Sequence, residues 1–123
     1  MMKVYLAAPW IRLDDAKTTK AQLQAAGFNV VSTWTEQRDT DDPRQLSLNA
    51  QSDEQQLLSA EAIVLLNLCK SEGKATEWGI ARQAGKLCVL VGPQEGNIFY
   101  RLPGIVQFDS LDEAIQYLTV MRS

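Results

Sequence analysis

The chain of 123 residues contains no histidine, and this absence excludes several kinds of catalytic site. A Ser-His-Asp triad, a Cys-His dyad and a histidine-ligated zinc ion cannot form within one such chain. Cys69 and Cys88 are the only cysteines, and two thiolates alone do not make a zinc site. Acid-base or nucleophilic chemistry therefore has to come from carboxylates, tyrosine, lysine or cysteine, and we expect neither a metal ion nor a cofactor.

An excess of basic residues and a long apolar run are absent as well. Twelve Lys and Arg against 15 Asp and Glu give a net charge of −3, which argues against a nucleic-acid polymer as the partner. No stretch approaches the roughly 20 apolar residues of a membrane span, and there is no Walker loop or GxGxxG motif. Both cysteines lie in or beside apolar runs, as free thiols of a cytoplasmic protein do. We expect a cytoplasmic protein that acts on a small molecule.

Apolar runs and helical periods alternate along the chain, whose length suits one domain over residues 1–123. Strands are predicted over 4–8, 28–34, 62–68, 87–92 and 105–108, and helices over 14–26, 45–59, 75–84 and 110–120. This alternation is typical of a parallel sheet covered on both faces. The predicted fold class is α/β, a three-layer α/β sandwich with a five-stranded, mainly parallel, doubly wound sheet of the Rossmann or flavodoxin-like kind. Ligands bind such sheets beyond the carboxyl ends of the strands.

A phospho-receiver domain has the same size and winding, but its acidic and basic residues are not all in place. Asp14 and Asp15 supply an acidic cluster after the first strand. The third strand, however, ends in Asn67–Cys69 instead of an aspartate, and no lysine follows the later strands at the required place. The pattern disfavours this reading.

Two carboxylates interrupt apolar helix faces. Asp53 falls within the apolar stripe of helix 45–59, and Glu77 shares a face with its i+3, i+4 and i+7 neighbours in helix 75–84. The apolar residues that define these faces are Leu46, Ala50 and Leu57 in the first helix and Ile80, Ala81 and Ala84 in the second. Taken singly, Asp53 at a stripe edge can reach solvent, and Glu77 near a helix start is favoured by the helix dipole.

As a pair, the two carboxylates suggest a reaction. The helix dipole favours an ionised Glu77, which suits a nucleophile, whereas apolar surroundings raise the pKa of Asp53, which suits a proton donor. An ionised carboxylate opposite a protonated one is the arrangement of a retaining glycosidase. This chemistry needs no histidine.

Three segments carry a resemblance to a known family. They are residues 5–10 (YLAAPW), Asp53 followed eight positions later by Glu61 and an apolar strand, and residues 73–79 (GKATEWG) leading to 84–86 (AGK). In this order they resemble the nucleoside 2-deoxyribosyltransferases and the related 2'-deoxynucleoside 5'-monophosphate N-hydrolases. The resemblance covers nearly the whole chain, and the Glu-x-Gly element at Glu77 is its most specific part.

The resemblance implies a role for each of four residues. Glu77 attacks C1' of a deoxyribosyl group and forms a covalent intermediate, while Asp53 protonates or orients the departing base. The Tyr5 hydroxyl holds the Glu77 carboxylate by a hydrogen bond. Trp10 flanks the base, on which its ring can stack. The deoxyribosyl group is then released to water or to a second base.

The resemblance leaves the two branches of the family open. Ser71, six residues before the nucleophile, matches the phosphate-binding serine of the hydrolases, and Gly73 with the following helix start completes a small anion site. Arg12 in the first loop can pair with a phosphate, although it is displaced by one residue from the hydrolase arginine. Trp10, in contrast, is typical of the transferases. The resemblance therefore implies a 2'-deoxynucleoside or its 5'-monophosphate as the substrate.

The resemblance further implies a homodimer or a higher homo-oligomer in which a neighbour's loop completes the pocket. The corresponding stretch is 94–101, and Asn97 is the residue expected to reach the sugar 5' end of the other subunit's substrate. The apolar residues Ile98, Phe99 and Tyr100 suit an interface or packing within the subunit. Two other functional classes stay open at this point: a non-catalytic nucleotide-binding or sensing module, and an interaction domain without a small ligand.

Overall fold

The computed structural model describes residues 1–122, which form five strands and four α-helices; the two alternate except that only a 3-10 turn separates the last two strands. The strands are β1 (Lys3–Ala7), β2 (Asn29–Val30), β3 (Ala62–Leu66), β4 (Leu87–Val91) and β5 (Val106–Phe108). The helices are α1 (Leu13–Ala25), α2 (Pro43–Ser59), α3 (Glu72–Gln83) and α4 (Leu111–Met121), and short 3-10 turns are η1 (Trp10–Arg12), η2 (Trp34–Glu36) and η3 (Ile98–Arg101). Within these residues no helix has the length and apolar character needed to cross a membrane.

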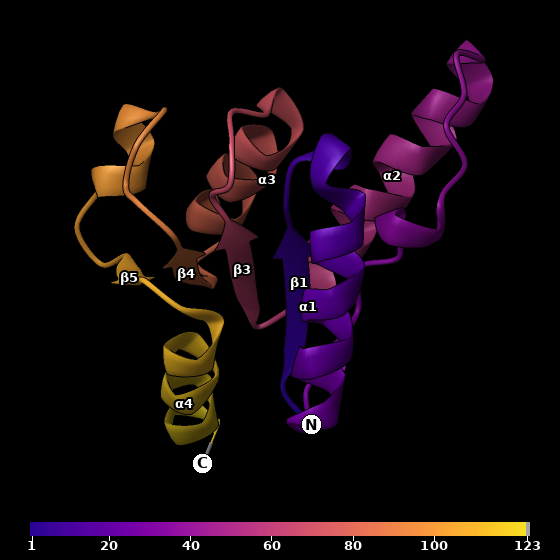
Figure 1. The fold of residues 1–123 in the computed structure, drawn as a ribbon. Helices are drawn as coiled ribbons and strands as arrows, with labels where there is room; N and C mark the ends of the chain where they lie inside the picture. Colours follow the sequence, from indigo (N-terminus) through magenta and orange to yellow (C-terminus); the bar gives the residue numbers. More distant parts are fainter. Residues whose placement is uncertain (123) are drawn as a thin grey trace.

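All five strands are parallel, in the order β2-β1-β3-β4-β5. The chain steps from β1 outward to β2 and then back to β3, so the winding reverses between β1 and β3, where ligands bind in open α/β sheets. Helices α2 and α3 pack together on one face of the sheet, and α1 covers β1 and β2 on the other (Figure 1). Helix α4 lies on the same face as α1, because the Arg122 side chain at its end contacts Ala26 and Phe28. This arrangement confirms the predicted three-layer α/β sandwich.

The central strands are continuously apolar because both of their faces are covered. Every residue of β3 is buried, and so are Val4–Ala7 of β1 and Cys88–Val91 of β4. Each fully buried aliphatic side chain contributes roughly 1.5–3 kcal/mol. The result is a rigid support that fixes the carboxyl ends of β1 and β3, and with them the residues that follow.

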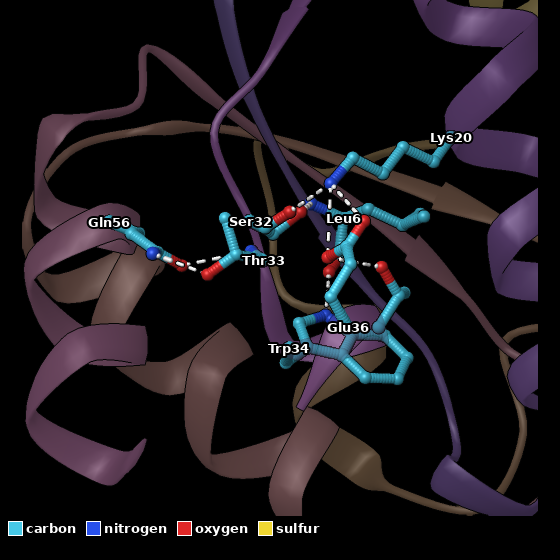
Figure 2. Close-up of polar contacts among 8 residues, drawn as sticks. Leu6, Lys20, Ser32, Thr33, Trp34, Glu36 and Gln56 are labelled. Carbon is cyan, nitrogen blue, oxygen red and sulfur yellow. Dashed lines mark hydrogen bonds and ion pairs between the residues drawn. The ribbon is translucent and has the colours of Figure 1, made fainter. Parts of the chain in front are cut away.

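The second strand is shorter than predicted. A strand was expected over 28–34, but β2 holds only Asn29 and Val30, and Trp34 begins η2. Side chains replace the ladder beyond β2: the Ser32 hydroxyl accepts a hydrogen bond from the Leu6 N–H at 3.0 Å, and Trp34 Nε1 donates to the Leu6 carbonyl at 2.7 Å (Figure 2). A run of β-branched and aromatic residues therefore continues alongside β1 without being a strand.

The first half of α2 is exposed, which corrects the expected burial of its apolar stripe. Leu57 is buried, but Leu46 is 49% exposed and Ala50 is also exposed. This half of the helix extends beyond the end of the sheet, where the loop that leads into it runs alongside (Figure 1). Asp53 therefore lies at the boundary between the exposed and the packed half of α2, and it is half-buried.

Removal of the Ser32 hydroxyl leaves the buried Leu6 N–H without its acceptor. We expect Ser32→Ala to lower the free energy of unfolding by about 1–3 kcal/mol, as measured by urea denaturation. The control Ser59→Ala removes an exposed hydroxyl bonded to the Gln56 carbonyl, and we expect a change below about 0.5 kcal/mol. If Ser32→Ala is as stable as the parent chain, the Ser32 hydroxyl does not replace a backbone hydrogen bond between β1 and the segment after β2.

Candidate active site

A cavity of about 420 Å³ opens at the carboxyl edge of the sheet, at the reversal between β1 and β3. Its walls come from the loops after β1 and β2, from α2 and from the first three turns of α3 with its N-cap Ser71. The lining residues are Ala8, Trp10, Trp34, Ala50, Asp53, Glu54, Leu57, Ser71, Gly73, Lys74, Thr76, Glu77 and Ile80. The cavity therefore contains both carboxylates that the helix patterns selected, and its volume lies in the range of small-molecule sites.

Tyr5 and Glu77 are in direct contact. Tyr5 lies in the middle of β1 and is fully buried, and its hydroxyl donates a short hydrogen bond to Glu77 Oε2. Glu77 lies on the side of α3 that packs against β1 and β3. Because the central strand fixes the tyrosine, this hydrogen bond fixes one carboxylate oxygen of Glu77 as well.

The pKa of Glu77 is raised to about 7, chiefly because burial disfavours the charged form. The Tyr5 hydrogen bond lowers this pKa, and the nearby Asp53 charge raises it. Helix α3 begins at Glu72, three residues earlier than predicted, so Glu77 lies in the second turn, where the helix dipole has faded. The expected stabilisation of the Glu77 anion by the dipole is therefore wrong, and Tyr5 is the group that favours the anion.

Asp53 faces the same cavity from α2. Gln37 Nε2 donates to Asp53 Oδ1 at 3.0 Å, which orients one carboxylate oxygen. Burial raises the pKa of Asp53, and the Gln37 hydrogen bond opposes this rise. The direction of this shift is the one expected of a carboxyl group that acts as a proton donor. Gln37 was not singled out by the sequence pattern.

Two tryptophans form an aromatic wall of the cavity. The Trp10 and Trp34 rings are 6.1 Å apart at an interplanar angle of 49°; Trp10 is 40% exposed, whereas Trp34 is buried. Trp34 was missed because its segment was interpreted as a strand. Its position in the loop after β2 is what brings it to the cavity, and the sequence pattern gave no sign of this.

The loop that carries Trp34 is tied to three elements by hydrogen bonds. Lys20 of α1 donates to the Ser32 carbonyl at 2.8 Å and contacts Glu36, while Gln56 of α2 bonds the Thr33 N–H and hydroxyl (Figure 2). With the Trp34–Leu6 bond, these contacts join the loop to α1, α2 and β1. They position Trp34 and, through α2, the wall that carries Asp53.

The other predicted substrate-binding residues are divided between the cavity and its surroundings. Ser71 and Gly73 line the cavity, and the Ser71 hydroxyl also caps α3 by accepting from the Lys74 N–H at 3.4 Å. Arg12 lies outside the lining, where its Nε bonds Asp15 at 2.7 Å. Asn97 is also outside, and its side chain caps η3 through the Phe99 N–H. One chain therefore unites six of the eight predicted residues: five line the cavity, and Tyr5 joins them through Glu77.

The residues described by the structure hold no cluster of three or more Cys, Asp or Glu side chains arranged to bind a metal ion. The buried Lys74, which the sequence pattern did not select, also lines the cavity. The site can supply two carboxyl groups of raised pKa, the hydroxyls of Tyr5, Ser71 and Thr76, one ammonium and an aromatic wall. This set suits proton transfer and nucleophilic attack by a carboxylate.

Ionising Glu77 should destabilise the folded chain, because its pKa is about 7 against an ordinary 4.5. Between pH 4.5 and about pH 7, the folded state holds more protons than the unfolded state. The stability that the neutral Glu77 carboxyl supplies is therefore complete below pH 4.5 and is lost as the pH rises through about 7. Glu77→Gln is always neutral. We expect it to raise the free energy of unfolding by roughly 1–3 kcal/mol at about pH 8 and by far less at about pH 5.

Chemical denaturation at both pH values measures this difference. Glu95→Gln, which neutralises an exposed loop carboxylate, is the control and should show no such dependence. An equal effect of Glu77→Gln at the two pH values contradicts the raised pKa.

The sequence matches no protein-family model and no curated protein. Solved structures share its fold, among them the following three. A 2-deoxyribosyltransferase from Bacillus psychrosaccharolyticus is 18% identical with a TM-score of 0.74, over 94% of this chain and 91% of that chain. A conserved protein from Enterococcus faecalis V583 is 16% identical with a TM-score of 0.70, over 98% and 99% of the two chains. A CMP N-glycosidase from Clostridium botulinum is 18% identical with a TM-score of 0.62, over 96% and 98%.

Proposed function

We propose that this chain is an enzyme of the nucleoside 2-deoxyribosyltransferase family, which cleaves the N-glycosidic bond of a 2'-deoxynucleoside or its 5'-monophosphate. The observation that carries the proposal is the hydrogen bond from Tyr5 to Glu77 beside a cavity that also contains Asp53. This geometry supports roles for Glu77 as the nucleophile, Tyr5 as the group that orients it and Asp53 as the proton donor. Retaining glycosidases work with such a pair of carboxyl groups.

In the first half of the reaction, a Glu77 oxygen attacks C1' of the deoxyribosyl group. The bond between C1' and the base nitrogen breaks, and its electron pair goes to the base. Asp53, whose pKa burial raises, gives its proton to the departing base. The products of this step are a deoxyribosyl ester of Glu77 and a free base. The Tyr5 hydroxyl holds the other Glu77 oxygen, which keeps the attacking oxygen aimed at the cavity.

In the second half, an acceptor attacks C1' of the ester and releases Glu77. A water molecule gives hydrolysis, and the nitrogen of a second base gives transfer. In both cases the Asp53 carboxylate takes the proton that the acceptor loses, which restores the starting state. Transfer needs room for a second base against Trp10 and Trp34, while hydrolysis needs only water, and both outcomes stay within the proposal.

The aromatic wall supports a planar leaving group. Trp10 and Trp34 line the same side of the cavity and offer ring faces on which a base can stack. The two enzymes with the same fold give independent support, since one is a 2-deoxyribosyltransferase and the other a CMP N-glycosidase. Both names describe chemistry at a bond between a sugar and a base.

The proposal keeps the homo-oligomer and the role of Asn97 that the resemblance implies. Ile98 is 80% and Phe99 58% exposed, and both follow Asn97 directly. These two side chains suit contact with a second copy of the chain. For Tyr100, which suited either an interface or packing within the subunit, the structure shows the second: it is buried against Trp78 at a ring distance of 5.6 Å. Ile98 and Phe99 are therefore the two apolar residues left for the proposed interface.

The function is tested by incubating the purified chain with a panel of 2'-deoxynucleosides and their 5'-monophosphates, with and without an acceptor base. Chromatography should show free base with at least one substrate. Glu77→Ala should lower kcat/KM by roughly 10³-fold or more, because the nucleophile is lost. Asp112→Asn on α4, far from the cavity, is the charge control and should be as active as the parent.

Three outcomes separate the hypotheses. An exchanged nucleoside indicates transfer, and free base with the deoxyribosyl product alone indicates hydrolysis. If no substrate is cleaved and Glu77→Ala binds nucleotides as well as the parent does, the chain is a non-catalytic nucleotide-binding module and the proposal is wrong.

The pH profile of kcat/KM tests the electrostatics of Glu77. Attack needs an ionised Glu77, and departure of the base needs a proton on Asp53, so the active pair holds one proton. Activity should therefore fall as pH passes about 7, where the pair loses this proton. Tyr5→Phe removes a hydrogen bond that lowers the pKa of Glu77, so the fall should move to higher pH. In Asp53→Asn no second carboxyl shares the proton, so the rate should drop and the fall above about 7 should disappear. A fall that persists in Asp53→Asn would refute the assignment of this limb to the pair.

A further inference from the structure

Glu54 lines the main cavity and has no partner in the chain. It follows Asp53 on α2 and is exposed. Within residues 1–122, its carboxylate makes no ion pair and no hydrogen bond. No basic residue lies three or four positions away on the helix, where the neighbours are Ala50, Gln51, Leu57 and Leu58. Contacts within the chain therefore do not explain why a charged residue stands at this position.

The helical spacing turns Glu54 toward the cavity. Ala50, Asp53 and Leu57 line the cavity from the same helix, and with Glu54 they occupy positions i, i+3, i+4 and i+7 of one helix face. Leu57 is buried at one end of this face, whereas Ala50 is exposed at the other. The Glu54 side chain is thus beside Asp53 and lies where the cavity meets solvent.

The cavity wall that contains Glu54 offers a bound base many hydrogen-bond acceptors and few donors. This wall is formed by α2 and the two tryptophans. Trp34 Nε1 already donates to the Leu6 carbonyl at 2.7 Å, so this N–H is not available to a ligand. The polar side-chain groups left on the wall are the Asp53 and Glu54 carboxyl groups and the Trp10 N–H. A base with hydrogen-bond donors on its edge therefore fits this wall best.

The two neighbouring carboxyl groups play different parts when the base departs. Asp53 holds the proton that it gives to the base, so it is a hydrogen-bond donor, and the Glu54 carboxylate next to it is an acceptor. The complementary base has an acceptor beside a donor. Adenine has this pair in N7 and its 6-amino group, and cytosine has it in N3 and its 4-amino group. Hypoxanthine, guanine, uracil and thymine have an oxo group in place of that amino group.

We propose that Glu54 selects the base, so that the preferred substrates contain adenine or cytosine rather than an oxo base. This inference rests on the proposed function. The amino group of the base donates to Glu54 while the neighbouring ring nitrogen receives the Asp53 proton. Protonation makes the amino N–H more positive, which strengthens its hydrogen bond to Glu54 as the base departs. An oxo group at the same place directs its lone pairs at the carboxylate, which disfavours the base.

Two matched pairs of substrates measure the preference: 2'-deoxyadenosine with 2'-deoxyinosine, and 2'-deoxycytidine with 2'-deoxyuridine. The members of each pair differ in one exocyclic group, amino or oxo, and in the proton on the adjacent ring nitrogen. The measured quantity is the ratio of kcat/KM for the amino member to kcat/KM for the oxo member, for the nucleosides and for their 5'-monophosphates. We expect this ratio to be about 10 or more in the parent chain.

Glu54→Gln should lower this ratio about 10-fold, because the new amide can donate to an oxo group. Glu54→Ala, which has no such donor, should lower the ratio chiefly by a loss of activity on the amino member. Because Glu54 is exposed, both variants are expected to fold. The control Asp112→Asn removes the same charge on α4 and should leave the ratio unchanged.

Two results overturn the inference. One is a parent chain that cleaves the two members of each pair equally well. The other is a Glu54→Gln chain in which kcat/KM for the amino and the oxo member changes by the same factor, because the residue would then act on the whole reaction and not on the choice of base.

Binding separates this inference from the proposed function. Affinities for the same nucleosides are measured by calorimetry in a Glu77→Gln chain, with and without Glu54→Gln. Tighter binding of the amino members that depends on Glu54, in a parent chain that cleaves no substrate, supports the inference and refutes the proposed function. Equal cleavage of both members supports the function and refutes the inference. If the chain neither cleaves nor binds any member of the pairs, both are wrong.

Discussion

The contact between Tyr5 and Glu77 is the constraint on which the site depends. A carboxylate that leaves water needs a hydrogen-bond donor, because its desolvation is otherwise uncompensated. Tyr5 is the donor to Glu77, and it is fixed by the most deeply buried part of the sheet. The hydrogen bond only partly offsets burial, so the pKa of Glu77 stays near 7. The carboxylate is thus held in one orientation and remains reactive near neutral pH.

The fold supplies the rest of the site through three loops and two helices at one edge of the sheet. Reversal of the winding between β1 and β3 opens the crevice, and α2 and α3 bring Asp53 and Glu77 to it from separate elements. The loop after β2 closes one side. Its hydrogen bonds to Leu6, Lys20 and Gln56 join it to β1, α1 and α2, so Trp34 is held beside β1 without a strand ladder.

The sequence predicted the fold and the two carboxylates, though not always for the right reason. Long apolar runs identify buried parallel strands reliably, and β3 is buried at every residue. Asp53 was selected because it interrupts an apolar stripe, yet half of that stripe is exposed. The sequence pattern missed Trp34 and Lys74. Tertiary packing decides which loop residue reaches the cavity and which lysine is buried, and a pattern of hydrophobicity contains no information about either. The pairing of Arg12 with Asp15 at a helical spacing was readable from the sequence.

The central claim is that Glu77 forms a covalent bond with the sugar, and mass spectrometry of the quenched reaction tests it most directly. During turnover of a cleaved substrate, the peptide containing Glu77 should gain the mass of one deoxyribosyl group, or of its 5'-phosphate for a nucleotide. Addition of an acceptor base or longer incubation should remove the added mass. Turnover with an unmodified Glu77 peptide, or an adduct on another residue, would contradict the account.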